Sequence, residues 1–284
     1  MPSDPGSGPR PGRYTVACIQ FEPKIGEVDA NLATIETNVE AAAARGASLV
    51  VLPELAPSGY VFESDEELAR LAGPVPEGKA AAFLVALARR LGIHIVSGIA
   101  EAAEGRVYNG ALLTGPDGFI GRYRKLHLWD KETLFFAPGD VGLPVFDTPL
   151  GKIGIAVCYD GWFPETFRTL ADAGAQIVCI PTNWVPMPSQ DPAVEAMANT
   201  LHKAAAHSNG IYIACADRVG VERGQPFIGQ SLILGPDGWP LAGPAHRSEA
   251  ETLLAEVDLT SIATVRQINA HNHVHADRRR DVYR

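Results

Sequence analysis

Short apolar runs alternate along this chain with segments whose apolar residues recur at helical spacing, and that alternation predicts a β/α protein. Runs without polar interruption indicate strands buried on both faces. We expect such strands at Tyr14–Phe21, in the run that ends at Pro53, at Ile93–Ile99 and at Ile153–Val157, and a hairpin formed by Val107–Thr114 and Phe119–Tyr123.

The helices are predicted from spacing and end signals. The first has an apolar stripe of Leu32, Ile35 and Val39, with Asp29 or Asn31 as its expected N-cap. Glycine follows the later helical segments, as is common where a helix ends. These segments are Lys79–Leu91 before Gly92, Pro164–Ala173 before Gly174, and Glu195–Ser208; a short helix is expected at Ser261–Ile268.

The second half of the chain repeats the first. AQIVCIPTN at 175–183 corresponds to ASLVVLPEL at 47–55, and GIYIACADRV at 210–219 corresponds to GIHIVSGIAE at 92–101. The turn GPDG occurs at 115–118 and again at 235–238, a period near 120 residues that is too long for a solenoid repeat. Two β/α halves with buried strands stack most simply as a four-layer αββα sandwich.

Composition narrows the class of function. The chain has 284 residues, 46% of them hydrophobic, and a formal net charge of −9, which argues against a nucleic-acid-binding face. We find no apolar run of the ~18 residues that a membrane span needs. Four cysteines in apolar runs, none in a CxxC motif, favour reduced thiols and a cytoplasmic protein. We expect a flexible arm at 1–12, one domain at 13–259, and a C-terminal helix and tail at 260–284.

Cys158 is the first candidate for chemistry. It follows the strand Ile153–Val157 and precedes a turn and a helix that begins with Pro164. Backbone N–H groups at such an elbow favour a thiolate and can hold an oxyanion. A buried structural cysteine is the alternative, since free cysteines are often buried.

Two acidic residues and a lysine complete the candidate set. Glu54 follows a buried strand, as Cys158 and Asn183 do, so the three are expected in the same crevice. Lys125 lies in a segment rich in apolar residues, with Glu132 seven positions on. An ammonium between Glu54 and Glu132 would stay charged in a dry pocket.

Three blocks of the sequence, LPELAPSGY, RKLHLWDKE and AVCYDGWFPE, resemble in their order and spacing the signature blocks of the nitrilase superfamily of carbon–nitrogen hydrolases. The resemblance extends from Tyr14 to about Leu259. It implies the αββα fold, a triad of Glu54, Lys125 and Cys158 with Glu132 as a second glutamate, and a homodimer that forms through the helices after Cys158 and Asn183. A small linear amide, hydrolysed through a thioester without metal or cofactor, is the expected substrate.

Aromatic and polar residues near these positions are the candidate pocket walls, although core packing is an equally common role for an aromatic side chain. They are Tyr60, Trp129, Tyr159, Trp162, Asn183 and Trp184.

The sequence is also compatible with other functions and with other roles for several residues. A nitrilase or an N-carbamoyl amidohydrolase would use the same triad, and a catalytically silent dimeric interaction module would keep the fold alone. His127 could serve as the base of a Cys–His pair, and Arg168 could anchor a substrate carboxylate. His271, His273 and His275 alternate as metal ligands can, but an Arg-rich terminus favours a solvated or partner-docked tail.

Overall fold

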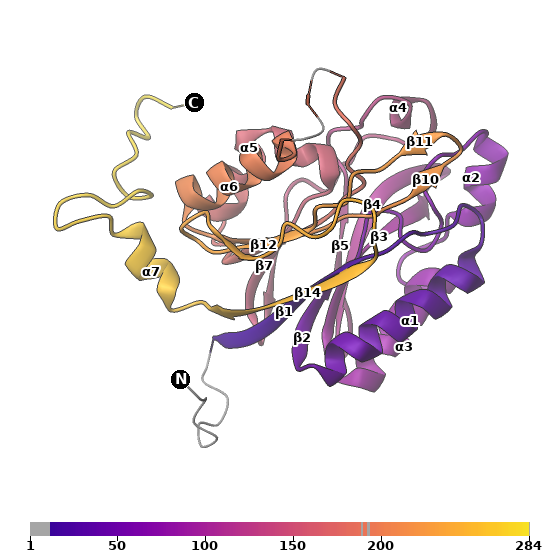
Figure 1. The fold of residues 1–284 in the computed structure, drawn as a ribbon, viewed down its shortest axis with the longest axis horizontal. Coiled ribbons are helices and arrows are strands. Elements are labelled where there is room, and N and C mark those ends of the chain that lie inside the picture. Colours follow the sequence, from indigo (N-terminus) through magenta and orange to yellow (C-terminus); the bar gives the residue numbers. More distant parts are fainter. Residues whose placement is uncertain (1–11, 189, 192–193, 284) are drawn as a thin grey trace.

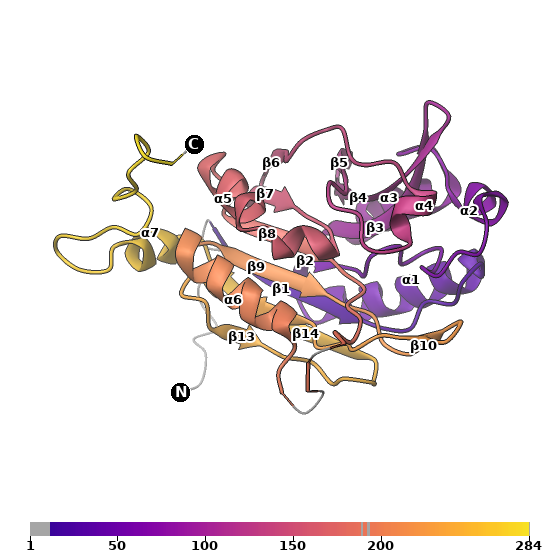
Figure 2. The same ribbon diagram turned by 90° about the horizontal axis from the view of Figure 1, so that it is seen from above.

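The computed structural model describes residues 12–188, 190–191 and 194–283. All but the last residue of the predicted arm at 1–12 lies outside this range. The described chain forms two six-stranded sheets, packed face to face, with helices on the outside (Figures 1 and 2). This is the αββα sandwich that the sequence predicts.

The first sheet has the order β14-β1-β2-β3-β4-β5. Its strands are β1 (Arg13–Gln20), β2 (Ala47–Val51), β3 (His94–Ala103), β4 (Arg106–Gly115), β5 (Gly118–Arg124) and β14 (Glu251–Asp258). β1, β2 and β3 are parallel, and β4 and β5 form the predicted hairpin. Helices α1 (Val28–Ala44) and α3 (Lys79–Leu91) pack on the outer face (Figure 1), and α2 (Asp65–Leu71) lies between β2 and α3 in the chain.

The second sheet repeats this arrangement in the order β13-β12-β9-β8-β7-β6. Its strands are β6 (Val145–Thr148), β7 (Gly151–Ile155), β8 (Ile177–Pro181), β9 (Tyr212–Ala216), β12 (Leu232–Leu234) and β13 (Pro240–Ala242). β7, β8 and β9 are parallel, and β12 is antiparallel to β9. Helices α5 (Pro164–Asp172) and α6 (Met197–Asn209) cover it (Figure 2). β2 and β8 are therefore equivalent strands, as the repeat predicts.

Shorter elements lie outside the two sheets and their covering helices. They are α4 (Glu132–Phe135), the 3₁₀ helix η1 (Cys158–Trp162), α7 (Ser261–Arg266) and the hairpin of β10 (Val221–Glu222) with β11 (Gln225–Pro226). Within the described residues no helix is long and apolar enough to cross a membrane.

The packing of the core explains why the strand sequences are apolar at nearly every position. Val16 and Cys18 of β1 pack in the layer shared with the second sheet, whereas Ala17 and Ile19 pack in the layer under α1 and α3. Successive side chains of a strand point to opposite faces, so a strand covered on both sides must be apolar at every position.

Helix α1 departs from its predicted start. It begins at Val28 with Glu27 as N-cap, so neither Asp29 nor Asn31 caps it. The Asn31 side chain instead bonds both the backbone N–H and C=O of Lys24, at 2.8 and 2.7 Å, and the carbonyl of Pro57 at 3.0 Å. A buried tertiary role has replaced the capping role.

Candidate active site

Cys158 lies at a strained elbow between β7 and α5. Its φ of +46° is in the left-handed region, which costs a non-glycine residue about 1–3 kcal/mol and persists only where the surroundings impose it. The thiol is buried at the start of η1. The sequence prediction of an elbow at this position is confirmed.

Asp160, which the sequence analysis did not single out, holds the elbow in place. Its Oδ2 accepts from the backbone N–H of Val157 at 3.0 Å and from the Tyr123 hydroxyl at 2.7 Å. Its Oδ1 accepts from the backbone N–H of His127 at 3.0 Å, and His127 Nδ1 lies 2.7 Å away. One buried carboxylate thus ties the Cys158 turn to the segment that carries Lys125.

Lys125 is enclosed between two glutamates. Its Nζ donates to Glu54 Oε1 at 2.7 Å and to Glu132 Oε1 at 2.7 Å, and the lysine and Glu54 side chains are fully buried. Asn109 Nδ2 also donates to Glu54 Oε1, at 2.7 Å. The Tyr60 hydroxyl donates to Glu132 Oε1 at 2.6 Å.

The two carboxylate oxygens of Glu54 differ in their hydrogen bonding. Its Oε2 is buried without a hydrogen-bond partner among the described residues. A buried carboxylate oxygen that accepts no hydrogen bond destabilises the charged form of the group. Glu54 Oε2 is therefore the oxygen that is available to receive a proton.

The protonation states follow from burial and charge. Burial raises the pKa of Glu54 to about 7, with Glu132 adding to the effect and Lys125 opposing it. Burial alone would lower the pKa of Lys125, but the charges of Glu132 and Glu54 outweigh it and raise that pKa, so the ammonium persists.

The thiol behaves differently from the sequence expectation. Burial raises the pKa of Cys158 well above its usual value, Glu54 and Glu132 add to this, and Lys125 opposes it. The predicted preference for a thiolate is therefore wrong for the resting site, because two nearby carboxylates and desolvation exceed the pull of one ammonium. A nucleophile in this state needs a base beside it, and Glu54 is a carboxyl whose pKa suits that task.

A cleft of about 270 Å³, part of it open to solvent, leads to Cys158. The residues that line it are Trp129, Cys158, Tyr159, Trp162, Asn183, Trp184, Val185 and Met187. Five of the six predicted wall residues are among them. The sixth, Tyr60, lines a neighbouring cavity that shares Trp129 and Val185 with the cleft.

Two further candidate residues, His127 and Arg168, are not among the residues that line the cleft. His127 stacks on Phe163, with ring centroids 3.7 Å apart, and its Nδ1 is engaged with Asp160. Arg168 donates to the carbonyl of Ser208 at 2.9 Å and lines a groove between α5 and α6, which shares only Trp162 with the cleft.

Metal binding finds no support in the described part of the chain. No group of three or more His, Cys, Asp or Glu there is arranged to hold an ion. His273 Nδ1, in the C-terminal tail, accepts from the backbone N–H groups of His275 and Ala276 at 3.2 and 2.9 Å.

Comparison with known proteins identifies the family. A family model for carbon-nitrogen hydrolases matches residues 15–267. The chain belongs to this family, within the nitrilase superfamily. It is therefore a carbon–nitrogen hydrolase by descent, as the three sequence blocks predict.

The relatives carry several activities within the family. A protein of Pyrococcus abyssi (strain GE5 / Orsay) named a nitrilase is 43% identical over 268 residues, which cover 94% of this chain and 98% of that one. An N-carbamoylputrescine amidase of Solanum lycopersicum is 34% identical over 287 residues, covering 95% and 93%. A solved mutant of the amidase from Nesterenkonia sp. AN1, with acrylamide added at its active-site cysteine, has a TM-score of 0.73 and 28% identity over 86% of this chain and 93% of that one.

Proposed function

We propose that this carbon–nitrogen hydrolase is an amidase that cleaves small, uncharged linear carboxamides to acid and ammonia through a thioester on Cys158. The observation that carries the proposal is the fully buried Lys125 ammonium held between Glu54 and Glu132, whose charge also acts on the pKa of the Cys158 thiol. Such a group can stabilise an oxyanion without reorganising, because its own contacts already fix it.

The first half of the reaction forms the acyl-enzyme. Glu54 takes the thiol proton as Cys158 Sγ bonds to the amide carbon, and the carbonyl oxygen becomes an oxyanion held by Lys125 and the backbone N–H of Tyr159. When this intermediate collapses, the C–N bond breaks and Glu54 returns its proton to the nitrogen. Ammonia leaves and a thioester remains.

The second half releases the acid. Glu54 takes a proton from a water molecule as the water oxygen attacks the thioester carbon, and the C–S bond then breaks. The proton on Glu54 returns to the sulfur, so the resting thiol is restored. Glu132 orients Lys125 in this scheme and exchanges no proton, because its Oε1 accepts from both Lys125 and Tyr60 and its Oε2 accepts from the backbone N–H of Trp129 at 3.1 Å.

The cleft supports a small and neutral substrate. None of the described residues that line the cleft is an acidic or basic residue, and three of the lining residues are tryptophans. A charged acyl group placed there would be desolvated without a partner, which is costly.

A screen for released ammonia tests the proposal. We expect wild type to hydrolyse small aliphatic amides, and both Cys158→Ala and prior alkylation with iodoacetamide to abolish the activity. Turnover of amides that survives complete alkylation of Cys158 would refute the proposed mechanism.

Nitrile hydrolysis is the second candidate, favoured by the 43% identity to a protein named a nitrilase. The same screen with nitriles and N-carbamoyl compounds in parallel separates the three substrate classes by their kcat/KM. Absence of ammonia from all three would instead favour a silent interaction module.

A further inference from the structure

A buried carboxylate from the second half of the chain reaches the loop that carries Tyr60. Glu222 of β10 is 5% exposed, and its Oε1 accepts from the backbone N–H groups of Tyr60 at 2.8 Å and Val61 at 2.7 Å. More than 160 residues of sequence separate the partners. Two charge-assisted bonds to successive N–H groups fix the path of this loop.

Arg218 holds Glu222 from the other side. Its Nη1 donates to Glu222 Oε2 at 2.9 Å, and its Nη2 donates to the carbonyl of Pro23 at 2.9 Å. The guanidinium lies over the ring of Phe227, 4.1 Å from the centroid, and that ring in turn meets the Tyr60 ring edge-on at 5.8 Å. Glu222 therefore has little freedom to move.

This pair is not readily explained by stability. A buried ion pair is often no more stabilising than apolar residues of the same volume, since desolvation offsets the attraction. What Arg218 and Glu222 provide is a fixed position, and the residue they position is Tyr60.

Tyr60 connects this pair to the lysine. Its hydroxyl donates at 2.6 Å to the same Glu132 oxygen that accepts from Lys125 at 2.7 Å. A shift of the loop at Tyr60 would move or remove this donor. Glu132 would then be held at Oε1 by Lys125 alone, and the ammonium would lose a fixed partner.

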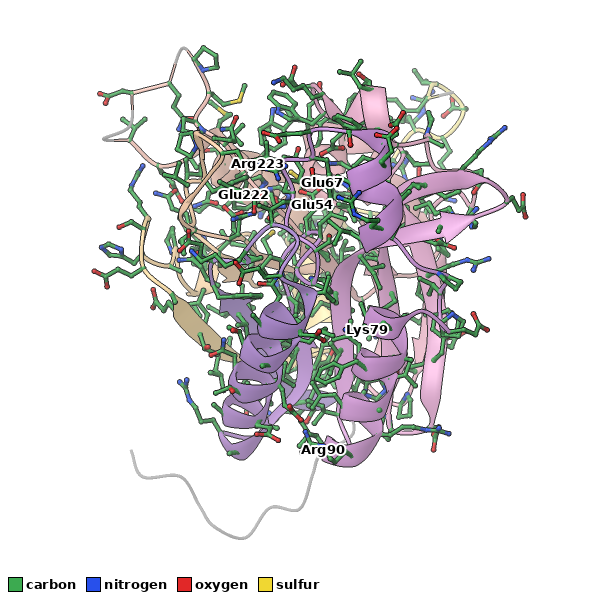
Figure 3. The ribbon with its side chains drawn as sticks, turned by 90° about the vertical axis from the view of Figure 1, so that its right-hand side faces the viewer. Glu54, Glu67, Lys79, Arg90, Glu222 and Arg223 are labelled. Atoms are coloured by element: carbon green, nitrogen blue, oxygen red, sulfur yellow. The ribbon has the colours of Figure 1, made fainter. Side chains whose placement is uncertain are left out.

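A second contact secures the outer side of the same hairpin. Arg223 donates to the carbonyl of Val61 at 2.8 Å and to both carboxylate oxygens of Glu67 at 2.7 Å (Figure 3). Figure 3 shows Glu222 and Arg223 next to each other at the end of the molecule where α2 carries Glu67. This exposed contact offers a control, because it touches the hairpin without touching Glu222.

We infer that Glu222, braced by Arg218, is a positioning residue for amide hydrolysis, which sets Tyr60 on Glu132 and thereby fixes Lys125 at the reacting carbonyl. The inference rests on the proposed amidase function. Small misplacements of a catalytic group can cost on the order of 100-fold in rate.

A double-variant cycle tests it. Glu222→Gln keeps the size of the side chain but replaces Oε2 with a donor that faces Arg218, so the loop is displaced; Tyr60→Phe removes only the hydroxyl. We expect Glu222→Gln to lower kcat by about 10- to 100-fold with KM within about threefold. In the Tyr60→Phe background the same substitution should lower kcat by no more than about twofold, since the contact it acts through is gone.

The control is Glu67→Gln, which should leave kcat within about twofold even if it lowers the melting temperature. The inference would be overturned if Glu222→Gln lowered kcat equally in the wild-type and Tyr60→Phe backgrounds, or if that variant kept full activity. In either case amide turnover by wild type would still support the proposed function. If Glu222→Gln does not fold, Glu222→Asp enters the same cycle with the same expectations. A wild type that releases no ammonia from amides overturns the proposed function itself.

Discussion

The side-chain amide of Asn183 donates to the backbone carbonyl of Glu54 at 3.0 Å. The two residues lie just beyond the ends of the equivalent strands β8 and β2, where Thr182 corresponds to Glu54 in the repeat and Asn183 is the next residue. The internal duplication thus brings the ends of two related strands together, beside the cleft that Asn183 and Cys158 line. In the second copy Thr182 stands in place of this carboxylate, and the amide of the next residue, Asn183, supports Glu54.

Gly98 is expected to be essential for the position of Glu54. A Cβ added at Gly98 on β3 would lie 2.4 Å from the Glu54 Cα, a backbone atom that cannot move aside cheaply. Gly98→Ala should therefore destabilise the protein by about 1–3 kcal/mol and lower kcat on amides by at least tenfold at temperatures where it is folded.

Gly73→Ala is the matched control for this prediction. A Cβ at Gly73 would have its nearest neighbour at 3.4 Å, which is an ordinary contact. Its kcat should stay within about twofold of wild type, as for most substitutions that introduce no clash. Chemical denaturation and ammonia release measure both effects; wild-type kinetics in Gly98→Ala would contradict the prediction.

The pH profile should report the ionisation of Glu54. Because burial raises the pKa of this carboxyl to about 7, the base is lost by protonation as the pH falls, and kcat/KM should decline below about pH 7. The bond from Asn109 lowers that pKa, so Asn109→Ala should move the acidic limb to higher pH.

Asn31→Ala provides the comparison, since Asn31 is a buried asparagine whose bonds are to Lys24 and Pro57. The acidic limb of the kcat/KM profile of Asn31→Ala should coincide with that of wild type. A limb that stays in place or moves to lower pH in Asn109→Ala would show that another group governs the rate.

The elbow at Cys158 depends on a glycine beside His202. A Cβ at Gly161 would lie 2.4 Å from His202 Nε2. The His202 ring is fully buried, with Nδ1 2.6 Å from the carbonyl of Ala198, and it contacts the rings of Phe167 and Trp184. We expect Gly161→Ala to displace the turn and lower kcat on amides by about tenfold or more.

A smaller partner should relieve this clash. Gly161→Ala combined with His202→Ala is expected to be faster than Gly161→Ala alone, because the added methyl group then has room. Steady-state kinetics decide the point. A double variant slower than both single variants would indicate that His202 contributes in some way other than by occupying this space.

The C-terminal tail is predicted to support a homodimer. Arg278 donates twice to Asp172 at the end of α5, at 2.7 Å for each bond, and Arg278 and Tyr283 line the groove between α5 and α6. These are the helices through which the family resemblance implies dimerisation. Deletion of 276–284 should shift the protein toward monomer in sedimentation velocity.

Arg279→Ala is a suitable control, because Arg279 pairs with Asp281 within the tail itself. It should leave the sedimentation profile unchanged. An unchanged profile after the deletion as well would contradict the proposed role of the tail.

The sequence predicted the fold because its signals are local. Strands that are apolar at every position, and helices that end before Gly92 and Gly174, can be predicted without knowing which elements they pack against. β14 was not among the predicted strands, although Leu253, Ala255 and Val257 are buried alternately along it, as the sequence pattern allows.

The supporting residues of the site could not be predicted in the same way. Asp160, Gly98 and Glu222 carry no local signal, since each contacts groups that are far away in the chain. The state of the Cys158 thiol likewise depends on carboxylates that only the fold brings near. Local pattern places the candidate nucleophile, but the balance of burial and charge around it is a tertiary property.

The most direct test of the account is intact-protein and peptide mass spectrometry of the enzyme quenched during turnover of a small amide. Wild type should carry one acyl group, located on Cys158, and Cys158→Ala should carry none and release no ammonia. Ammonia released by Cys158→Ala at the wild-type rate, or an acyl group found on another residue, would contradict the claim that Cys158 is the nucleophile.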